Sequence, residues 1–424
     1  MGIELSIVIL ASQEKENLTI LIPLLKSRLE KIGVTSEIII VDNDSRDGSR
    51  ELSDSYSVRY IIQRFPGYGG ALKTAFTDAK GEYVLTLDAD LSHSPDFIHN
   101  FWAKKDEADV LIASRYIKSG KATMPFIRLV LSKILNLFYR KILAMEIRDL
   151  SSGYRMYRSA LIKNLEILSQ DFDALQEILT KIYNAGWKIK ELPFEYIPRK
   201  YGKSKVKLLH FAFAYLKNIF KMWKLRHSVS AADYDFRAYN SLNLIKRYWQ
   251  RKRYAIISGF IKNFDKVLDI GCGSASFIIR NPNVIGIDPR INVLRFDKNN
   301  GCRVACGSLE RLPVKDGKFD AVVCSEVVEH IPVNNVNFKE FNRVLSKNGI
   351  FVIGTPDYGK IEWRFIEYCY KKLVPLGYAS EHINRYTFSS LLNKLQEYGF
   401  TVEGYKYILN GELIIKAKKI KDFV

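Results

Sequence analysis

Two carboxylates follow an apolar run in the first half of this 424-residue chain. Residues 83–87 are typical of a buried strand, and Asp88 and Asp90 stand at its end. Two hard carboxylate oxygens and a diphosphate form a natural site for Mg²⁺ or Mn²⁺, in which the metal neutralises the charge of a departing diphosphate. Exposed loops carry such pairs by chance, so the pair gains weight only from its neighbours.

Polar and glycine-rich clusters follow the other predicted strands of this half. Asp42 ends the strand at residues 37–41, where its carboxylate could accept a hydrogen bond from a nucleobase N–H. The Gly-Tyr-Gly-Gly segment at residues 67–70 would let the backbone approach a phosphate closely. A calcium loop beginning at Asp42 is excluded, because Arg46 occupies the third ligand position and Ser53 stands where a bidentate glutamate is needed.

A second group of residues that could bind a ligand lies in the second half of the chain. A predicted strand at residues 267–270 leads into a turn that holds Gly271 and Gly273, which would admit a ligand's carboxylate and ribose to amides at a helix N-terminus. Asp288 ends the next apolar strand, and its carboxylate suits the two hydroxyls of a ribose. Dinucleotide binding is one interpretation, although the third glycine of that fingerprint is missing.

The elements that must position these side chains alternate between strands and helices. In the first half, a helix is predicted at residues 17–31 and strands at residues 3–10, 36–41, 83–87 and 110–113. This alternation indicates an α/β fold with a mostly parallel sheet covered on both faces, which binds ligands at the carboxyl ends of its strands. A second series of strands and helices begins at Lys266. Between the two series lies a basic, aromatic segment, and a boundary inside it gives domains 1–229 and 230–424.

Composition narrows the class of protein. Hydrophobic residues make up 47% of the chain and charged residues 26%, as in a globular protein. The five cysteines form neither a disulfide framework nor a recognisable metal motif, so buried thiols are expected. We expect no signal peptide, and basic residues interrupt each apolar stretch that could span a bilayer. The net charge of +19 indicates an anionic partner, which could be nucleic acid, an anionic membrane face or a phosphate-bearing substrate.

Several motifs in the first half, in order along the chain, resemble family 2 glycosyltransferases, and more narrowly the dolichyl- or polyprenyl-phosphate mannosyl- and glucosyltransferases. The resemblance covers residues 1–225 and rests on Ser6-Ile7-Val8-Ile9, Glu14-x-Glu16-Asn17, Val41-Asp42-Asn43-Asp44-Ser45, Gly67-Tyr68-Gly69-Gly70-Ala71-Leu72, Asp88-Ala89-Asp90-Leu91-Ser92-His93, Ala113-Ser114-Arg115-Tyr116, Asp149-Leu150-Ser151-Ser152-Gly153-Tyr154-Arg155 and Pro198-Arg199-Lys200-Tyr201-Gly202-Lys203-Ser204-Lys205. It implies a GT-A-type fold that binds a nucleotide sugar, and an inverting transfer of a hexose to polyprenyl (dolichyl) phosphate.

The resemblance also implies a role for each matching polar residue. Asp88 and Asp90 would bind Mg²⁺ or Mn²⁺, and Glu14 and Asp42 would bind the nucleotide. The acceptor phosphate would be held by Arg115, Arg199 and Lys205, with Arg128 and Arg155 as weaker candidates. Because that phosphate is already an anion, the reaction needs no general base, and the protein must supply position and charge balance.

Residues 10–13 depart from the Pro-x-Tyr-Asn pattern that usually precedes the glutamate of this family, and only Glu14 is kept. The departure leaves the donor open between GDP-mannose and UDP-glucose. Residues 124–147 and 206–225 carry apolar side chains at helical spacing with basic residues between them. Such segments could pack on the protein core, but beside an acceptor site in so basic a chain they favour peripheral contact with a membrane.

Motifs in the second half resemble class I methyltransferases, with a Rossmann-like fold that binds S-adenosylmethionine. The resemblance covers residues 235–424 and rests on Leu268-Asp269-Ile270-Gly271-Cys272-Gly273, Ile287-Asp288, Leu312-Pro313, the run from Phe319 to His330, Arg343-Val344-Leu345-Ser346-Lys347-Asn348-Gly349 and Gly399-Phe400-Thr401-Val402. It implies that Asp269, Gly271 and Gly273 surround the amino-acid end of the cofactor and that Asp288 binds its ribose. Ser308 replaces the acid that often binds adenine, and His330 and His382 are candidate bases for a hydroxyl proton, although each alone is more often structural.

These features together predict a bifunctional transferase at the cytosolic face of a membrane. One module would attach a hexose to a polyprenyl phosphate, and the other would methylate a hydroxyl, on the same glycan or lipid if the fusion reflects a shared substrate. Two alternatives stay open: one module could be a degenerate binding or scaffold domain, or the glycosyltransferase could act on a non-lipid acceptor. Methylation of nucleic acid is disfavoured, because the basic charge is accompanied by no recognised nucleic-acid fold.

Overall fold

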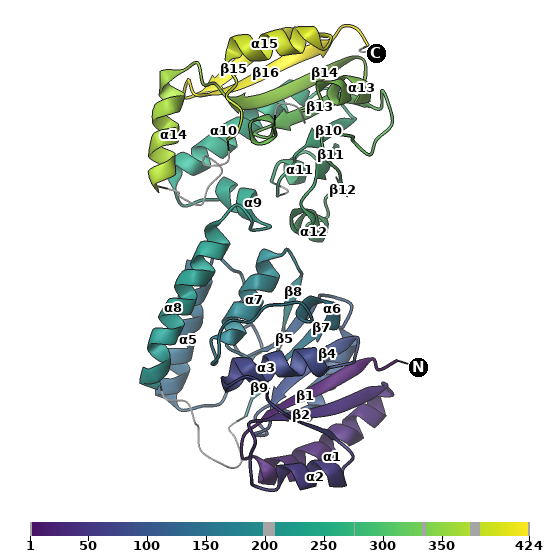
Figure 1. The fold of residues 1–424 in the computed structure, drawn as a ribbon, viewed down its shortest axis with the longest axis vertical. Helices are drawn as coiled ribbons and strands as arrows, with labels where there is room; N and C mark the ends of the chain where they lie inside the picture. The colour runs from purple at the N-terminus through teal and green to yellow at the C-terminus, as the bar shows by residue number, and fades with distance from the viewer. Residues whose placement is uncertain (1, 198–207, 275, 333–335, 374–381, 423–424) are drawn as a thin grey trace. The chain divides into compact units, whose positions relative to one another are not determined.

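The computed structural model describes residues 2–197, 208–274, 276–332, 336–373 and 382–422. The chain divides into two compact units (Figure 1). The first contains residues 1–183 and 187–226, and the second contains residues 184–186 and 227–424.

The first unit is built on a seven-stranded sheet with the order β3-β2-β1-β4-β7-β5-β8. Its strands are β1 (Leu5–Ala11), β2 (Ser36–Asp42), β3 (Arg59–Ile62), β4 (Tyr83–Asp88), β5 (Val110–Ser114), β7 (Arg155–Arg158) and β8 (Ile189–Pro193), and a small second sheet pairs β6 (Lys121–Ala122) with β9 (Glu195–Tyr196). Only β7 runs antiparallel to its neighbours in the large sheet, so the expected mostly parallel sheet is confirmed.

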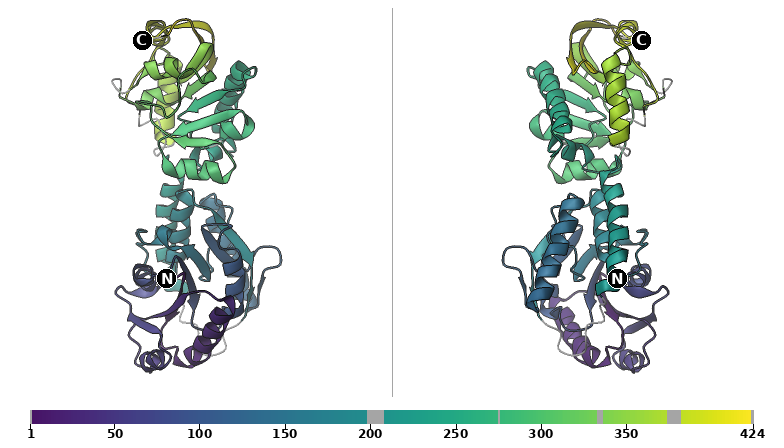
Figure 2. Two further views of the ribbon diagram at one scale, coloured as in Figure 1. Left: turned by 90° about the vertical axis from the view of Figure 1, so that its right-hand side faces the viewer. Right: turned by 90° about the vertical axis from the view of Figure 1, so that its left-hand side faces the viewer.

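Helices cover both faces of this sheet (Figures 1 and 2). They are α1 (Lys15–Ile32), α2 (Ser49–Ser55), α3 (Gly67–Asp78), the 3₁₀ turn η1 (Pro95–Phe97), α4 (Ile98–Ala103), α5 (Phe126–Ile142), α6 (Ser159–Ile162), α7 (Ala174–Asn184) and α8 (Leu208–His227). Alternate residues of β1 enter two different cores, because successive strand side chains point to opposite faces. Ile7 packs with α1 and α4, whereas Val8 packs with α3 and α7.

Both units place their functional loops at the carboxyl ends of parallel strands. In the first unit, Leu10 of β1 lies opposite both Val41 of β2 and Asp88 of β4, so the ends of these three strands are level. The strand β5 runs in the same direction as β4, because each is antiparallel to β7. Arg115, which follows β5, therefore emerges at the same edge of the sheet as Asp88.

The second unit has its own seven-stranded sheet, with the order β12-β11-β10-β13-β14-β16-β15. Its strands are β10 (Val267–Ile270), β11 (Val284–Asp288), β12 (Val304–Cys306), β13 (Phe319–Ser325), β14 (Leu345–Pro356), β15 (Phe400–Ile408) and β16 (Glu412–Lys419). The first five are parallel, and β16 is antiparallel to both of its neighbours. A central strand with the chain winding outward on both sides is a doubly wound, Rossmann-like arrangement, so the predicted α/β class is confirmed for both units.

The helices of the second unit also form two layers (Figure 1). They are α9 (Tyr234–Tyr239), α10 (Leu244–Ile261), α11 (Ser276–Arg280), α12 (Ile291–Asn299), the 3₁₀ turn η2 (Val328–His330), α13 (Phe338–Val344), α14 (Ile361–Leu373) and α15 (Phe388–Glu397). Apolar residues of α10 and α11 form one core cluster, and those of α13 and α15 form the other. All five thiols are unbridged, and the expectation of buried thiols is confirmed for Cys272 and Cys324 but is wrong for Cys306, which is exposed, and for the half-buried Cys302 and Cys369.

The amphipathic segment at residues 124–147 forms α5, and its apolar side chains do not all reach the core. Tyr139 is buried, and the neighbouring Leu143 packs with it, but Phe126 and Ile127 are 77% and 74% exposed. Five further residues of the helix expose apolar side chains: Val130, Leu131, Ile134, Leu137 and Phe138. Within the part of the chain that the structure describes, no helix combines the length and hydropathy needed to cross a bilayer.

Candidate active sites

The first candidate site lies where β4 ends. Asp90 is buried, and its Oδ1 accepts hydrogen bonds from the backbone N–H (3.1 Å) and the hydroxyl (2.5 Å) of Ser92. Asp88 is more open to solvent, with its side chain 35% exposed, and Oδ1 lies 3.4 Å from the Tyr68 hydroxyl. The turn after β4 thus holds one fixed carboxylate and one accessible carboxylate. Such a pair could bind a divalent cation.

The predicted nucleotide ligands lie at the ends of the two neighbouring strands. Asp42 is fully buried and accepts hydrogen bonds from the backbone N–H (2.5 Å) and hydroxyl (2.9 Å) of Ser45. The same hydroxyl accepts the backbone N–H of Gln13 at 2.8 Å, so the loops after β1 and β2 are tied together. Glu14 stands at the start of α1 and accepts a hydrogen bond from Asn17 at 2.6 Å.

The glycines of the 67–70 segment have a structural explanation that differs from our expectation. They form the first turn of α3, and the space that a Cβ would occupy is filled by the chain's own backbone. A Cβ on Gly69 would lie 2.0 Å from the Ser169 carbonyl oxygen, and one on Gly70 would lie 2.2 Å from that of Phe65. Close packing against these two loops requires glycine here, whether or not phosphate approaches the segment.

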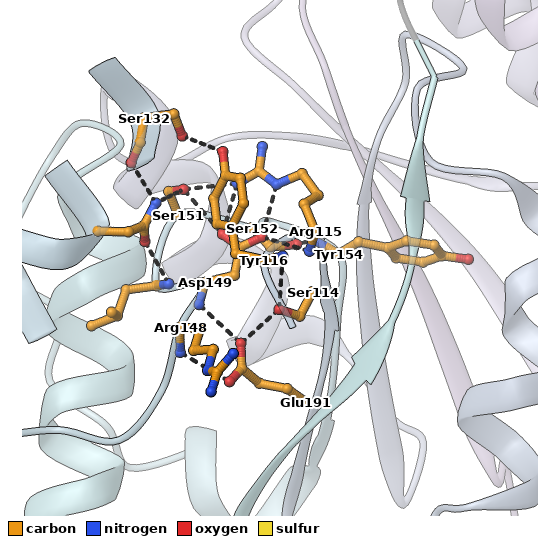
Figure 3. A network of polar contacts seen from close by, with 12 residues as sticks. Ser114, Arg115, Tyr116, Ser132, Arg148, Asp149, Ser151, Ser152, Tyr154 and Glu191 are labelled. Atoms are coloured by element: carbon orange, nitrogen blue, oxygen red, sulfur yellow. Dashed lines mark hydrogen bonds and ion pairs between the residues drawn. The ribbon is translucent and has the colours of Figure 1, made fainter. Parts of the chain in front are cut away.

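Arg115 is held by a buried carboxylate (Figure 3). Its Nε and Nη2 donate to the two oxygens of Asp149 at 2.8 and 2.7 Å, and Nη2 also donates to Ser151 at 2.7 Å. Burial alone would raise the pKa of Asp149, but the adjacent guanidinium outweighs it and lowers that pKa. The arginine is thus fixed in place, with its orientation set by a bidentate ion pair.

Further contacts attach this ion pair to the surrounding elements. Glu191 of β8 accepts the backbone N–H groups of Arg148 and Asp149, both at 2.9 Å, and the hydroxyl of Ser114 at 2.7 Å (Figure 3). Asn136 of α5 donates to Ser151 at 2.9 Å. The exposed helix α5 is therefore locked to the loop that positions Arg115.

A basic pocket of about 370 Å³ opens beside this network. Four cationic side chains line it: Arg115, Lys133, Arg140 and Arg148. Arg155 is completely buried instead, and donates to the carbonyl oxygens of Leu150 (2.7 Å) and Leu175 (2.9 Å), so its proposed contact with the acceptor was wrong. Arg128 is exposed near the start of α5. The predicted ligands Arg199 and Lys205 lie outside the described residues.

The second unit contains a larger pocket, of about 850 Å³, at the carboxyl ends of its parallel strands. Asp269, Gly271, Gly273, Asp288 and Ser308 all line this pocket. Both glycines have positive φ angles, 71° for Gly271 and 54° for Gly273, which side chains other than glycine rarely adopt. A Cβ on Gly271 would also lie 2.3 Å from Val327. The turn therefore needs glycine for its conformation and for the space.

Two of the residues that line this pocket are buried acids, Asp269 and Asp288. Burial, and then the negative charge of Asp288, raises the pKa of Asp269 to about 8. Asp288 accepts the backbone N–H of Gly273 at 3.1 Å and is paired with Arg290 at 3.0 Å. A cationic ligand group beside Asp269 would offset the unfavourable burial of its charge. Ser308 stands on the exposed side of the same pocket.

Two imidazoles that line the same pocket lie side by side. The rings of His330 and His382 have their centroids 4.8 Å apart, although more than fifty residues separate them in the sequence. Their side chains are largely buried, with 18% and 5% exposed. The two candidate bases thus form one group beside the predicted cofactor residues.

Comparisons with known proteins match both units. The family model described as "Glycosyl transferase family 2" matches residues 6–166, and that described as "Methyltransferase domain" matches residues 268–353. A polyprenol monophosphomannose synthase from Mycolicibacterium smegmatis is 31% identical over 215 residues, which cover 47% of this chain and 80% of that protein. The chain belongs to glycosyl transferase family 2. It joins this glycosyltransferase domain to a methyltransferase domain, as the sequence motifs predicted.

Two further similarities extend over part of this family 2 member. A dolichol-phosphate mannosyltransferase from Pyrococcus furiosus is 34% identical over 230 residues, 52% of this chain, and the match spans 64% of that relative's length. A solved glucosyl-3-phosphoglycerate synthase from Mycobacterium tuberculosis, in complex with Mn²⁺, UDP and glucosyl-3-phosphoglycerate, is 15% identical, covers 53% of this chain and 80% of its own, and has a TM-score of 0.42.

Each domain of this family 2 member has one further residue that contacts its candidate site and that the sequence did not single out. In the first domain this residue is His93. His93 is buried, stacks on Tyr154 with ring centroids 4.9 Å apart, and accepts the backbone N–H of Asp88 on Nδ1 at 3.0 Å. Its Nε2 lies 4.0 Å from the Asp88 carboxylate. Burial lowers the pKa of His93, although Asp88 and Asp90 oppose that effect. Its place in the Asp-Ala-Asp-Leu-Ser-His motif was the available signal.

Asp235, in the methyltransferase domain, is the second such residue. Its carboxylate accepts the backbone N–H of Ser274 at 3.3 Å, and its own N–H donates to the Ser274 hydroxyl at 2.9 Å. A Cβ on Gly273 would lie 2.5 Å from this carboxylate. Asp235 thus closes over the glycine turn from α9, an element that no motif in the sequence marks.

Proposed function

We propose that the first domain transfers mannose from a nucleotide sugar to a polyprenyl phosphate. The observation that carries the proposal is the shared sheet edge, where Asp42, the Asp88–Asp90 pair and the fixed Arg115 come together. The names of both relatives specify a mannosyl group and a dolichol or polyprenol phosphate. These names favour GDP-mannose over UDP-glucose as the donor.

The roles of the residues follow from charge and position. Asp88 and Asp90 would hold Mg²⁺ or Mn²⁺, which stabilises negative charge on the leaving diphosphate when bound. Asp42 would accept from the nucleobase, and His93 would keep Asp88 in position. An oxygen of the acceptor phosphate then bonds to the anomeric carbon as the bond to the nucleoside diphosphate breaks, with inversion. Because the phosphate oxygen already carries negative charge, no protein group needs to remove a proton.

The acceptor would enter through the basic pocket beside α5. Arg115, Lys133, Arg140 and Arg148 supply positive charge there, and the exposed apolar face of α5 lies next to them. A polyprenyl phosphate has the complementary pattern, an anionic head on an apolar chain. We therefore propose that α5 lies in the interface of an anionic membrane on its cytosolic side, so that the head group reaches the pocket while the chain stays in lipid.

The second domain would transfer a methyl group from S-adenosylmethionine to a hydroxyl. Two positive-φ glycines and the buried acids Asp269 and Asp288, all of which line one pocket, fit a ligand with an ammonium group and a ribose. The cofactor supplies a methyl group on a positively charged sulfur. His330 and His382 lie where they could take the proton that the acceptor hydroxyl must lose.

A transfer assay tests the first domain. Radiolabelled GDP-mannose or UDP-glucose is incubated with the full chain, a short polyprenyl phosphate and Mg²⁺ or Mn²⁺, and label is counted in the organic phase. The proposal predicts organic-phase label from GDP-mannose that depends on the divalent cation. Label from UDP-glucose alone would correct the donor. Absence of label from both, with a folded chain that binds nucleotide, would instead favour a non-lipid acceptor or a domain that only binds.

A further inference from the structure

A carboxylate and two imidazoles converge beside the methyltransferase pocket. Glu329, His330 and His382 each offer one ligand atom, and these three atoms all lie within 4.8 Å of one another. His330 and His382 both line the large pocket that also holds the predicted cofactor residues.

The backbone fixes this convergence. Glu329 and His330 belong to the turn η2, directly after β13, and the chain returns to that turn at residues 382–384. The carbonyl oxygen of Glu329 accepts the backbone N–H groups of Ile383 (2.8 Å) and Asn384 (3.0 Å). The side chain of Asn384 donates to the carbonyl oxygen of Val328 at 3.1 Å. These bonds, made by the two residues that follow His382, hold His382 beside η2.

Glu329 carries a carboxylate oxygen that none of the described residues satisfies. Its side chain is completely buried, and Oε2 accepts the Thr355 hydroxyl at 3.2 Å. Among the residues that the structure describes, Oε1 has no hydrogen-bond partner, and Nε2 of His330 lies 3.9 Å from it. A buried carboxylate oxygen with no donor is unfavourable unless a cation meets it.

The hydrogen bonds of His382 prepare one ring nitrogen for a metal. The Tyr358 hydroxyl donates to Glu367 at 2.8 Å, so it has no proton left for the histidine. The contact of 2.9 Å between that hydroxyl and Nδ1 of His382 therefore uses a proton on Nδ1. In the neutral ring Nε2 is then the unprotonated nitrogen. A chain of carboxylate, hydroxyl and imidazole of this kind is the outer shell that orients metal-binding histidines.

We propose that Glu329, His330 and His382 bind a divalent metal ion, with Zn²⁺ as the best match, in the acceptor end of the methyltransferase pocket. Two imidazoles and one carboxylate are a donor set that Zn²⁺ accepts, and three protein ligands leave a coordination position for a substrate oxygen. The proposal rests on the proposed methyl transfer, assigns His330 and His382 to the ion in place of proton removal, and narrows the substrate to a hydroxyl that can contact the ion. The ion would lower the pKa of that hydroxyl. The oxygen then bonds to the methyl carbon, the carbon–sulfur bond breaks with its electron pair kept by sulfur, and the hydroxyl proton passes to solvent.

Metal binding can be measured without a methyl acceptor. The full chain is expressed without a polyhistidine tag and carries Asp90→Ala, so that the first domain contributes less metal binding. After treatment with a chelator, Zn²⁺ is titrated calorimetrically, and Co²⁺ is titrated as a spectroscopic probe of imidazole ligation. The proposal predicts one site in the second domain with a Co²⁺ visible spectrum.

Two variants of the proposed ligands and one control variant test which residues bind the metal. His382→Ala and the isosteric Glu329→Gln should each weaken Zn²⁺ binding at least tenfold and abolish the Co²⁺ spectrum, whereas Glu310→Gln, which removes an exposed carboxylate from the same pocket, should change neither. Unaltered Zn²⁺ affinity in the first two variants, or no Zn²⁺ binding by the parent, overturns the proposal. Binding of S-adenosylmethionine is measured on the same samples and shows whether each variant is folded. A parent chain that binds Zn²⁺ but not S-adenosylmethionine would refute the proposed methyl transfer and leave the metal site standing.

Discussion

Replacing Asp269 with asparagine should stabilise the cofactor-free methyltransferase domain, and the gain should depend on pH. Burial and the charge of Asp288 raise the pKa of Asp269 from 3.8 to about 8. Between these two values the unfolded chain has released a proton that the folded chain keeps, so stability falls as pH rises. At pH 7 the difference is about 3 pKa units, or about 4 kcal/mol at roughly 1.4 kcal/mol per unit. Near pH 4 it approaches zero.

Asparagine has the same shape and no charge to bury. Asp269→Asn should therefore raise the free energy of unfolding by up to about 4 kcal/mol at pH 7, which for a domain of this size raises the melting temperature by roughly 10 °C. Calorimetry at pH 5, 6 and 7 measures the shift. The relevant transition is the one that moves when S-adenosylmethionine is added to the parent chain. The exposed neighbour Asp265→Asn is the matched control and should leave that transition unchanged at each pH.

The variant should also bind S-adenosylmethionine more weakly, because Asp269 is the proposed partner of the cofactor's amino group. Two results would refute the reasoning: a stabilisation that is equal at all three pH values, or a loss of stability at pH 7. The first would mean that the carboxylate is not the source of the effect. The second would mean that Asp269 makes stabilising contacts as an anion.

Two further outcomes follow from the first domain. The double variant Phe126→Ser, Ile127→Ser should co-sediment severalfold less with anionic phospholipid vesicles, because it loses two exposed apolar side chains. Its nucleotide binding should not change. Co-sedimentation equal to that of the parent chain would mean that α5 does not contact the membrane. Asp149→Asn should lower the free energy of unfolding by about 3–5 kcal/mol, since it leaves the largely buried charge of Arg115 without its partner. Urea unfolding of the first domain measures this change. A change below about 1 kcal/mol would show that the pair behaves like a surface salt bridge.

The sequence was informative where local pattern determines position. Alternating apolar runs predicted the strands, and the polar residues at their ends, such as Asp42 and Asp88, were correctly expected at the carboxyl edge of a sheet. The same holds for Asp288 in the second domain. A parallel sheet makes this inference possible, since each strand end then marks the same edge whatever lies between the strands in sequence.

The sequence was less informative where a residue's role depends on distant parts of the chain. The packing of Gly69 against the Ser169 backbone, a hundred residues away, could not be read from a glycine-rich motif. Arg155 belongs to a motif of polar residues, yet the strand it begins lies in the middle of the sheet, so its side chain is buried. The meeting of Glu329 with His382 requires a return of the chain that no periodicity encodes.

Sugar transfer by variants of the Asp88–Asp90 pair tests the central claim most directly. The full chain, Asp88→Ala, Asp90→Ala and the exposed control Asp54→Ala are compared for divalent-cation-dependent transfer from GDP-mannose to polyprenyl phosphate, with folding checked by circular dichroism. If the pair holds the cation that balances the leaving diphosphate, both site variants should lose on the order of 100-fold or more in rate, because several kcal/mol of charge stabilisation is removed. Asp54→Ala should keep the parent rate. Parent-like transfer by a folded Asp90→Ala variant would contradict the assignment of this site.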